Sequence, residues 1–165
     1  MLDGSTIIIC GFNKTRVKLN ARIRDYNNFT EHTPMIGDRV ICLKNNKRSN
    51  IPLYNGAHGT VRHITKNSRF EFATGVIEMD GTNEDMFRGK IAYDGFSQEK
   101  IDAYSMPTGR DVFDYGYVIT THKSQGSEFR RVLVIEEGRD IWADTWNRWL
   151  YTAVTRSQSE LLIVG

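Results

Sequence analysis

Cysteine and proline are scarce in this 165-residue chain, which has two of the former and three of the latter. Cys10 and Cys42 each lie inside a short apolar run, and neither has a partner at the spacing of a metal site. We therefore predict two buried free thiols in a reducing compartment, a cytoplasmic protein and no bound metal.

Long hydrophobic runs are also missing. No run approaches the roughly 18 apolar residues that a membrane span needs. The first five residues lack the basic stretch and apolar core of a secretory signal. With 39% hydrophobic and 25% charged residues, the composition predicts a soluble globular protein without a membrane partner.

The net charge is only +2, but it is unevenly distributed. Residues 1–48 carry nine Lys or Arg and four Asp or Glu, an excess of 9 − 4 = +5. Such an excess suits a polyanionic ligand, and it fits a solvated helix face and a polar loop equally well. Eight of the nine basic residues make up the candidate patch, namely Lys14, Arg16, Lys18, Arg22, Arg24, Lys44, Lys47 and Arg48.

Four short apolar runs are nearly continuous rather than alternating. Such runs predict strands buried on both faces, as in a parallel sheet covered by helices. The runs are residues 7–10, 118–120, 132–135 and 161–164.

Two helical patterns lie between these runs. The first begins with Asn13 as its cap and ends near Tyr26, with Leu19, Ile23 and Tyr26 as its buried stripe. The second precedes the last run and has Asp144 or Thr145 as its cap. Strand–helix alternation at both ends of the chain predicts an α/β fold. The apolar face of the second helix consists of Trp146, Trp149, Leu150, Ala153 and Val154.

The middle of the chain, from residue 36 to 96, is rich in glycine and turn residues. Short strands are expected near residues 39–43, 60–64, 76–79 and 90–93, which together predict a small barrel. Residues 37–40 and 55–61 resemble paired strands of an SH3-like barrel. We therefore predict a discontinuous α/β domain, residues 1–35 and 97–165, interrupted by a β insert at 36–96.

Two segments carry candidate chemistry. Residues 118–129 place the hydroxyls of Thr120, Thr121 and Ser124 where a buried strand ends, which suits phosphate oxygens but also describes an ordinary strand-to-helix turn. Arg156 follows the second helix, where a guanidinium can stabilise a transferring phosphoryl group or simply complement the helix dipole.

Together these segments resemble superfamily I helicases. Residues 121–129 (THKSQGSEF) look like motif V, residues 151–157 (YTAVTRS) look like motif VI, and residues 7–20 resemble motif IV of the 5′-to-3′ branch. That branch includes the exonuclease V alpha-subunit-like and phage Dda-like helicases. The resemblance implies a RecA-like lobe (domain 2A) with a parallel sheet, interrupted by an SH3-like domain 2B.

The resemblance also implies roles for single residues. Arg156 would be the arginine finger for ATP, with Gly126 and Glu128 near the ribose. The segment after the buried strand would contact single-stranded DNA, and His122 could instead be a structural histidine bonded to backbone. The helical spacing of Trp146 and Trp149 favours core positions over base stacking. The implied DNA-binding residues are Thr120, Thr121, His122, Ser124, Asn13 and Lys14.

The sequence contains no G-x-x-x-x-G-K-[ST] motif and no Walker B carboxylate pair. We therefore expect the C-terminal motor lobe of an ATP-dependent DNA helicase that moves 5′-to-3′ on single strands and is inactive by itself. ATP and magnesium would be held mainly by an N-terminal helicase lobe, on the same or another chain, with recombination or replication proteins as further partners. The alternative is a non-catalytic module that binds nucleic acid or protein. A nuclease is the weakest hypothesis, because no carboxylate cluster is visible.

Overall fold

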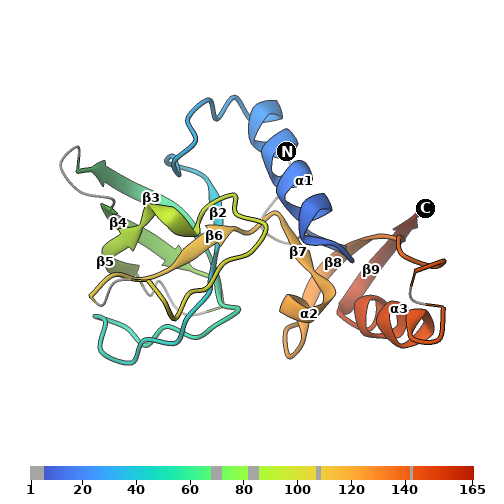
Figure 1. The fold of residues 1–165 in the computed structure, drawn as a ribbon. Coiled ribbons are helices and arrows are strands. Elements are labelled where there is room, and N and C mark those ends of the chain that lie inside the picture. Colours follow the sequence, from blue (N-terminus) through green and yellow to red (C-terminus); the bar gives the residue numbers. More distant parts are fainter. Residues whose placement is uncertain (1–5, 68–71, 82–85, 107–108, 142) are drawn as a thin grey trace. The chain divides into compact units, whose positions relative to one another are not determined.

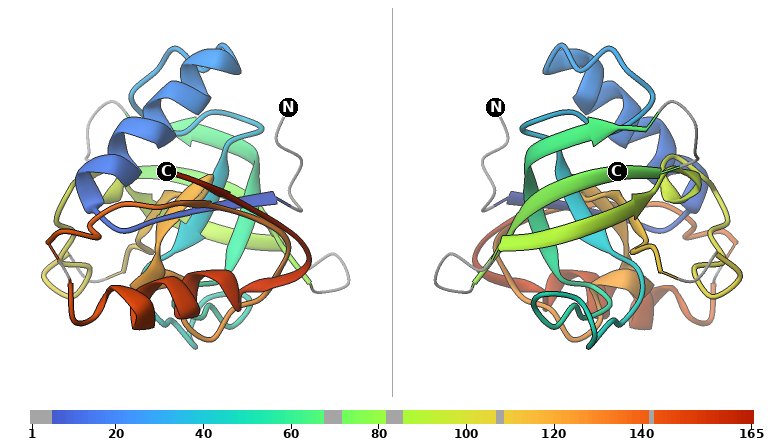
Figure 2. Two further views of the ribbon diagram at one scale, coloured as in Figure 1. Left: turned by 90° about the vertical axis from the view of Figure 1, so that its right-hand side faces the viewer. Right: turned by 90° about the vertical axis from the view of Figure 1, so that its left-hand side faces the viewer.

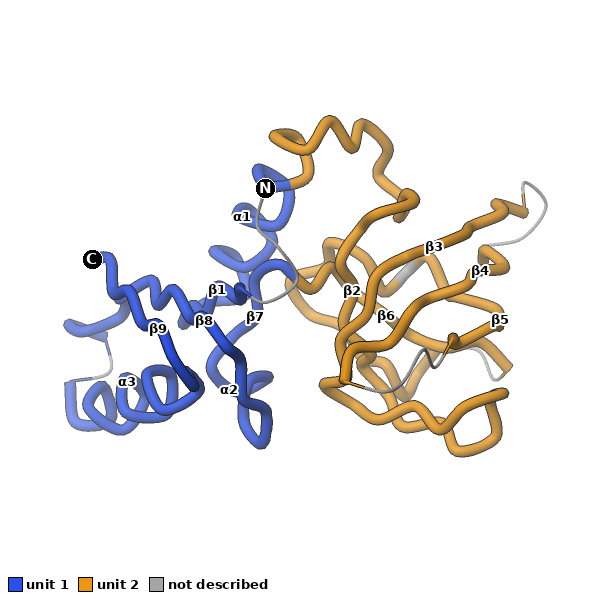
Figure 3. The backbone as a smooth tube through the Cα atoms, turned by 180° about the vertical axis from the view of Figure 1, so that it is seen from behind, with its two compact units in different colours: residues 1–23, 117–165 blue, residues 24–116 orange. Residues whose placement is uncertain are grey.

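Two separate sheets make up the fold. The computed structural model describes residues 6–67, 72–81, 86–106, 109–141 and 143–165. Its contacts divide the chain into one unit of residues 1–23 and 117–165 and a second unit of residues 24–116 (Figure 3). Each unit contains one of the two sheets.

The first unit has a four-stranded parallel sheet with the order β7-β1-β8-β9 (Figure 1). Ile8 of β1 pairs with Val118 of β7 on one side and with Leu133 of β8 on the other. The four predicted runs are therefore neighbours in one sheet, and the predicted α/β class with a parallel sheet is confirmed. The strands are β1 (Thr6–Cys10), β7 (Val118–Thr120), β8 (Phe129–Ile135) and β9 (Ser157–Val164).

The burial of this sheet differs from strand to strand. Ile9 in β1 and Val118 in β7 are fully buried, as a strand covered on both faces should be. The edge strand β9 is different, because its apolar residues 161–164 are 42 to 57% exposed. The prediction of burial on both faces is therefore wrong for β9.

Helix α1 (Asn13–Tyr26) lies on one face of this sheet, and α3 (Trp146–Val154) lies on the other (Figures 1 and 2). The predicted bounds of α1 are confirmed, but its predicted stripe is not. Tyr26 is 80% exposed, whereas Arg16, Asn20 and Arg24 are buried. Asn20 is buried because its side-chain amide donates to the carbonyl of Val118 at 2.9 Å and accepts from the N–H of Val118 at 3.0 Å, which pairs the open edge of β7.

The residues at the amino ends of α1 and α3 differ from the predicted caps in detail. Asn13 is the first residue of α1 rather than its cap, and its Oδ1 accepts from Arg16 Nε at 3.2 Å. Thr145 holds the cap position of α3, but its side chain makes no capping hydrogen bond to the helix. On α3, Ala153 and Trp149 are buried as predicted, and Trp146 lies half-buried beneath the guanidinium of Arg139, 4.4 Å from the ring centre.

The second unit has a five-stranded antiparallel sheet with the order β5-β4-β3-β2-β6 (Figure 2). Phe87 and Phe113 pack in its core with ring centres 5.4 Å apart. The insertion of a separate β structure is confirmed. The unit reaches beyond the predicted 36–96, because β6 joins the same sheet. The elements are β2 (Arg39–Cys42), β3 (His58–Lys66), β4 (Phe72–Met79), β5 (Met86–Ala92), the 3-10 turn η1 (Tyr93–Gly95) and β6 (Phe113–Tyr115).

A buried ion pair holds the entry to this unit. Arg24 donates from Nε to Asp38 Oδ1 at 3.0 Å and from Nη2 to Asp38 Oδ2 at 3.1 Å. Its guanidinium also lies 4.1 Å from the centre of the Tyr115 ring. Arg24 therefore stabilises the fold, and the expectation that it belongs to a basic patch open to a polyanion is wrong.

None of the helices described has both the length and the apolar composition needed to cross a bilayer.

Candidate functional site

The turn after β7 is fixed by buried hydroxyls. Thr120 and Thr121 are 6% and 3% exposed, and Thr121 Oγ1 donates to the carbonyl oxygen of Cys10 at 3.4 Å. Ser124 is fully buried, and its hydroxyl donates to the Thr121 carbonyl at 2.8 Å. The side chain of Ser124 therefore closes the one-turn helix α2 (Thr121–Ser124), which corrects the expectation that it contacts DNA.

Exposed groups follow this turn. His122 and Gln125 are exposed, and Gly126 has a φ of +82°, a left-handed conformation that favours glycine. The glycine lets the chain reverse from α2 toward β8, so the motif V-like segment crosses from one end of the sheet to the other.

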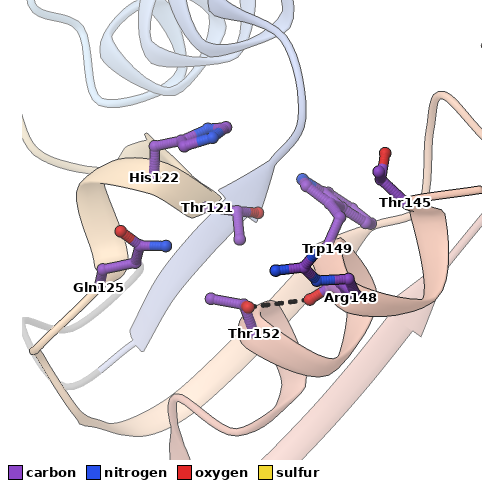
Figure 4. Close-up of a pocket in the computed structure, with 7 residues that line it drawn as sticks. All are labelled: Thr121, His122, Gln125, Thr145, Arg148, Trp149 and Thr152. Atoms are coloured by element: carbon purple, nitrogen blue, oxygen red, sulfur yellow. Dashed lines mark hydrogen bonds between the residues drawn. The ribbon is translucent and has the colours of Figure 1, made fainter. Parts of the chain in front are cut away.

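A pocket of about 300 Å³ lies between α2 and α3 (Figure 4). Side chains from the α2 segment face those of α3 across it, and the guanidinium of Arg148 extends between Trp149 and Thr152. Thr152 is held by a 2.8 Å hydrogen bond from its hydroxyl to the Arg148 carbonyl. The lining residues are Thr121, His122, Gln125, Thr145, Arg148, Trp149 and Thr152.

A carboxylate that the sequence analysis missed lies at the start of α1. Glu137 Oε1 accepts from the N–H groups of Gly11 and Phe12, both at 2.7 Å, and Oε2 accepts from Thr15 Oγ1 at 2.8 Å. The Phe12 amide lies at the helix N-terminus, where N–H groups have no intrahelical partner, and the Gly11 amide lies just before it. Burial, together with the nearby charge of Glu137, raises the pKa of the Cys10 thiol to about 12. Glu137 therefore anchors the loop that presents Asn13 and its neighbours.

Part of the predicted basic surface remains exposed on α1. Asn13 and Lys14 are exposed, as DNA contact requires. Lys18 and Arg22 are also exposed, and Lys14, Lys18 and Arg22 recur every four residues, which places them on one face of the helix. Arg16, by contrast, is buried, so its inclusion in an open basic patch is wrong.

The predicted ATP-binding residues gather at the amino ends of β8 and β9. The backbone N–H of Phe129 donates to the carbonyl of Arg156 at 2.8 Å, which brings Arg156 beside the segment that carries Gly126 and Glu128. Glu128 is exposed, and its Oε2 accepts from Gln158 Nε2 at 3.1 Å.

The guanidinium of Arg156 donates hydrogen bonds to three acceptors. Nε donates to the Thr152 carbonyl at 3.0 Å, and Nη2 donates to Thr155 Oγ1 at 3.0 Å, at the carboxyl end of α3. Nη1 donates to the carbonyl of Ser127 at 3.3 Å, within the motif V-like segment. Arg156 thus complements the helix end and also links the two predicted motifs.

The sheet therefore separates the predicted residues into two groups. The carboxyl ends of β7 and β1 are followed by the predicted DNA-binding residues Thr120, Thr121, His122, Asn13 and Lys14. The amino ends of β8 and β9 carry the predicted ATP-binding residues Gly126, Glu128 and Arg156. Within the described part of the chain, no three His, Cys, Asp or Glu side chains group in a way that could hold a metal ion.

Part of the chain matches a known protein family. Residues 115–164 match the UvrD-like helicase C-terminal domain. Over 70 residues, 42% of this chain and 6% of the other, the chain is 39% identical to an uncharacterized protein of Methanocaldococcus jannaschii.

Solved structures of Pif1 helicases share the fold. Pif1 from Bacteroides in complex with ADP-AlF3 and single-stranded DNA matches all of this chain and 41% of its own length, with a TM-score of 0.65 and 18% identity. Pif1 from Candida albicans matches 99% of this chain and 46% of its own length, with a TM-score of 0.59 and 14% identity. The resemblance to the C-terminal part of a superfamily I helicase is confirmed. The chain spans less than half the length of each of these two Pif1 structures.

Proposed function

We propose that this chain is the C-terminal motor lobe of an ATP-dependent helicase that moves 5′-to-3′ on single-stranded DNA. The observation that carries the proposal is the link between the two motifs, in which Arg156 bonds to Ser127 beside Gly126 and Glu128. A Bacteroides Pif1 of the same fold has been solved with ADP-AlF3 and single-stranded DNA, which supports both ligands for this chain.

The groups at the amino ends of β8 and β9 suit a nucleotide. A guanidinium has five N–H donors, and the three bonds of Arg156 described above engage three of them. Its remaining donors can meet the γ-phosphate, and its charge can stabilise the phosphoryl group in transfer. The exposed Glu128 carboxylate can accept from ribose hydroxyls. The magnesium and the β- and γ-phosphates would be held by a P-loop lobe, since the sequence contains no P-loop.

The groups at the carboxyl ends of β7 and β1 suit a nucleic-acid backbone. His122, Asn13 and Lys14 are exposed there, and the buried Thr120 and Thr121 fix the turn and supply backbone groups at its edge. Contacts of this kind hold phosphates independently of sequence. Binding of ATP between this chain and the P-loop lobe would then bring the two together and move this DNA-holding surface relative to the P-loop lobe.

A second candidate is a non-catalytic nucleic-acid-binding module with a helicase fold. It is favoured by the same bonds of Arg156, because a guanidinium that completes the end of α3 already has a structural role. The two candidates differ in what the loss of Arg156 does to ATP turnover.

The test uses the chain joined to a P-loop-bearing helicase lobe. We expect Arg156→Ala to lower ATP turnover by about 10³ to 10⁵ while leaving single-strand affinity unchanged. Arg130→Ala, on an exposed position of β8, is the matched control and should leave turnover unchanged. Circular dichroism and thermal unfolding check that the Arg156 variant folds. Turnover near the wild-type rate in a folded Arg156→Ala protein contradicts the motor and favours the binding module.

A further inference from the structure

The pocket between α2 and α3 is only partly accounted for by the roles assigned so far. Of its lining residues, Thr121 and His122 belong to the proposed DNA surface, but Gln125, Arg148 and Thr152 have no assigned function. We propose that this pocket is a subsite for one backbone phosphate and its sugar in single-stranded DNA, and that Arg148 is its phosphate-binding residue. The inference rests on the proposed function and extends its DNA surface from α2 onto α3.

The charge of the pocket supports an anion. The seven described lining residues include the guanidinium of Arg148 and the imidazole of His122, and none of the seven carries a carboxylate. Arg148 is exposed, and its guanidinium extends into the pocket opposite Gln125 (Figure 4). A planar guanidinium can donate two parallel hydrogen bonds to phosphate oxygens, which makes arginine well suited to this contact.

The size and walls of the pocket support a nucleotide unit. A volume of about 300 Å³ lies at the small end of the range for ligand pockets. The buried Trp149 ring and the methyl groups of Thr121 and Thr152 give apolar surface against a deoxyribose, while Gln125 and Thr145 add hydrogen-bonding groups at the rim. The pocket therefore combines a cation for the phosphate with an apolar wall for the sugar.

The position of the pocket supports continuity with the proposed DNA path. Thr121 and His122 line the pocket and also follow the carboxyl end of β7, where the proposed backbone contacts begin. A strand that meets His122 can place its next phosphate against Arg148 without leaving the surface of the first unit. Single-stranded DNA is therefore the occupant that the surroundings favour over a free nucleotide.

The experiment measures binding of the full chain to a fluorescein-labelled oligothymidylate by anisotropy at several salt concentrations. We expect Arg148→Ala to weaken binding roughly tenfold, the loss of about one charged hydrogen-bond contact. If three phosphates are contacted in the wild type, the log–log salt slope should fall from about −2 to about −1.4. Arg148→Lys should keep the wild-type salt slope but only part of the wild-type affinity, because lysine keeps the positive charge but cannot donate two parallel hydrogen bonds to one phosphate.

Arg130→Ala removes one exposed positive charge of the same unit outside the pocket and serves as the matched control. A wild-type chain that binds oligothymidylate, with Arg148→Ala equal to Arg130→Ala in affinity and slope, overturns the subsite and leaves the proposed function standing. A folded wild-type chain that does not bind oligothymidylate at all overturns both.

Discussion

Glu137 should contribute to stability through the loop that it anchors, and its removal is a defined perturbation. Glu137→Ala deletes two acceptor oxygens that receive three hydrogen bonds of 2.7, 2.7 and 2.8 Å from Gly11, Phe12 and Thr15. A hydrogen bond to a charged group contributes about 1.5–3 kcal/mol where it is buried. Glu137 is only half-buried, so water can reach the freed amides and the losses do not add in full. We expect a loss of about 2 kcal/mol in the free energy of unfolding.

The isosteric variant separates charge from hydrogen bonding. Glu137→Gln keeps an acceptor for the amides and can donate to Thr15, so it should lose only the interaction of the charge with the helix N-terminus, about 0.3–1 kcal/mol. The neighbouring Glu136→Gln is the control, because Glu136 pairs only with the exposed Arg139 in the described structure, at 2.6 Å, and should change stability by less than about 0.5 kcal/mol.

Urea unfolding gives these free energies, and hydrogen exchange at the Gly11 and Phe12 amides reports the loop directly. Faster exchange at both amides in Glu137→Ala, with unchanged exchange in Glu136→Gln, is the expected pattern. Equal unfolding free energies for Glu137→Ala and Glu136→Gln, with unchanged exchange at Gly11 and Phe12, would refute the reasoning.

Two further predictions concern the second unit. Arg24→Met should destabilise it by about 3–5 kcal/mol, because Asp38 is then left as a buried, uncompensated charge; urea unfolding measures this, and a change below about 1 kcal/mol would argue against a buried pair. Burial, followed by the nearby charge of Arg39, lowers the pKa of His58 from 6.5 to about 4. As the pH falls, His58 binds a proton in the unfolded chain before it does so in the folded chain. The contribution of His58 to the free energy of unfolding is therefore fully present above about pH 6.5, and up to about 3 kcal/mol is lost as the pH drops toward 4. His58→Gln should flatten this part of the pH profile, and an unchanged profile would contradict the assignment.

The strands of the parallel sheet could be predicted because buried parallel strands are continuous apolar runs. The exposure of β9 could not be read from its sequence, since residues 161–164 are as apolar as those of the buried strands. Both β7 and β9 are edge strands, but Asn20 of α1 covers the edge of β7, whose residues are buried. Exposure is therefore decided by which elements cover a strand, and that is a property of the assembled fold.

Other features were missed for identifiable physical reasons. The buried face of α1 is polar because Asn20 pairs the backbone of β7 and Arg24 pairs with Asp38, and hydrophobic periodicity cannot detect such a face. Strand β6 is only three residues long and contains a buried aspartate, Asp114. Glu137 meets Gly11 across 126 positions of sequence, so no local pattern indicates that contact.

We propose that this chain supplies a DNA-holding motor lobe and depends on a P-loop lobe for hydrolysis. The most direct test titrates the isolated chain with labelled single-stranded DNA at several salt concentrations, beside a phosphate-release assay with ATP. We expect weak binding with a log–log salt slope of about −2, which corresponds to roughly three phosphate contacts on a single strand, and no phosphate release. Binding that does not change with salt, or robust DNA-stimulated hydrolysis by the chain alone, would contradict it.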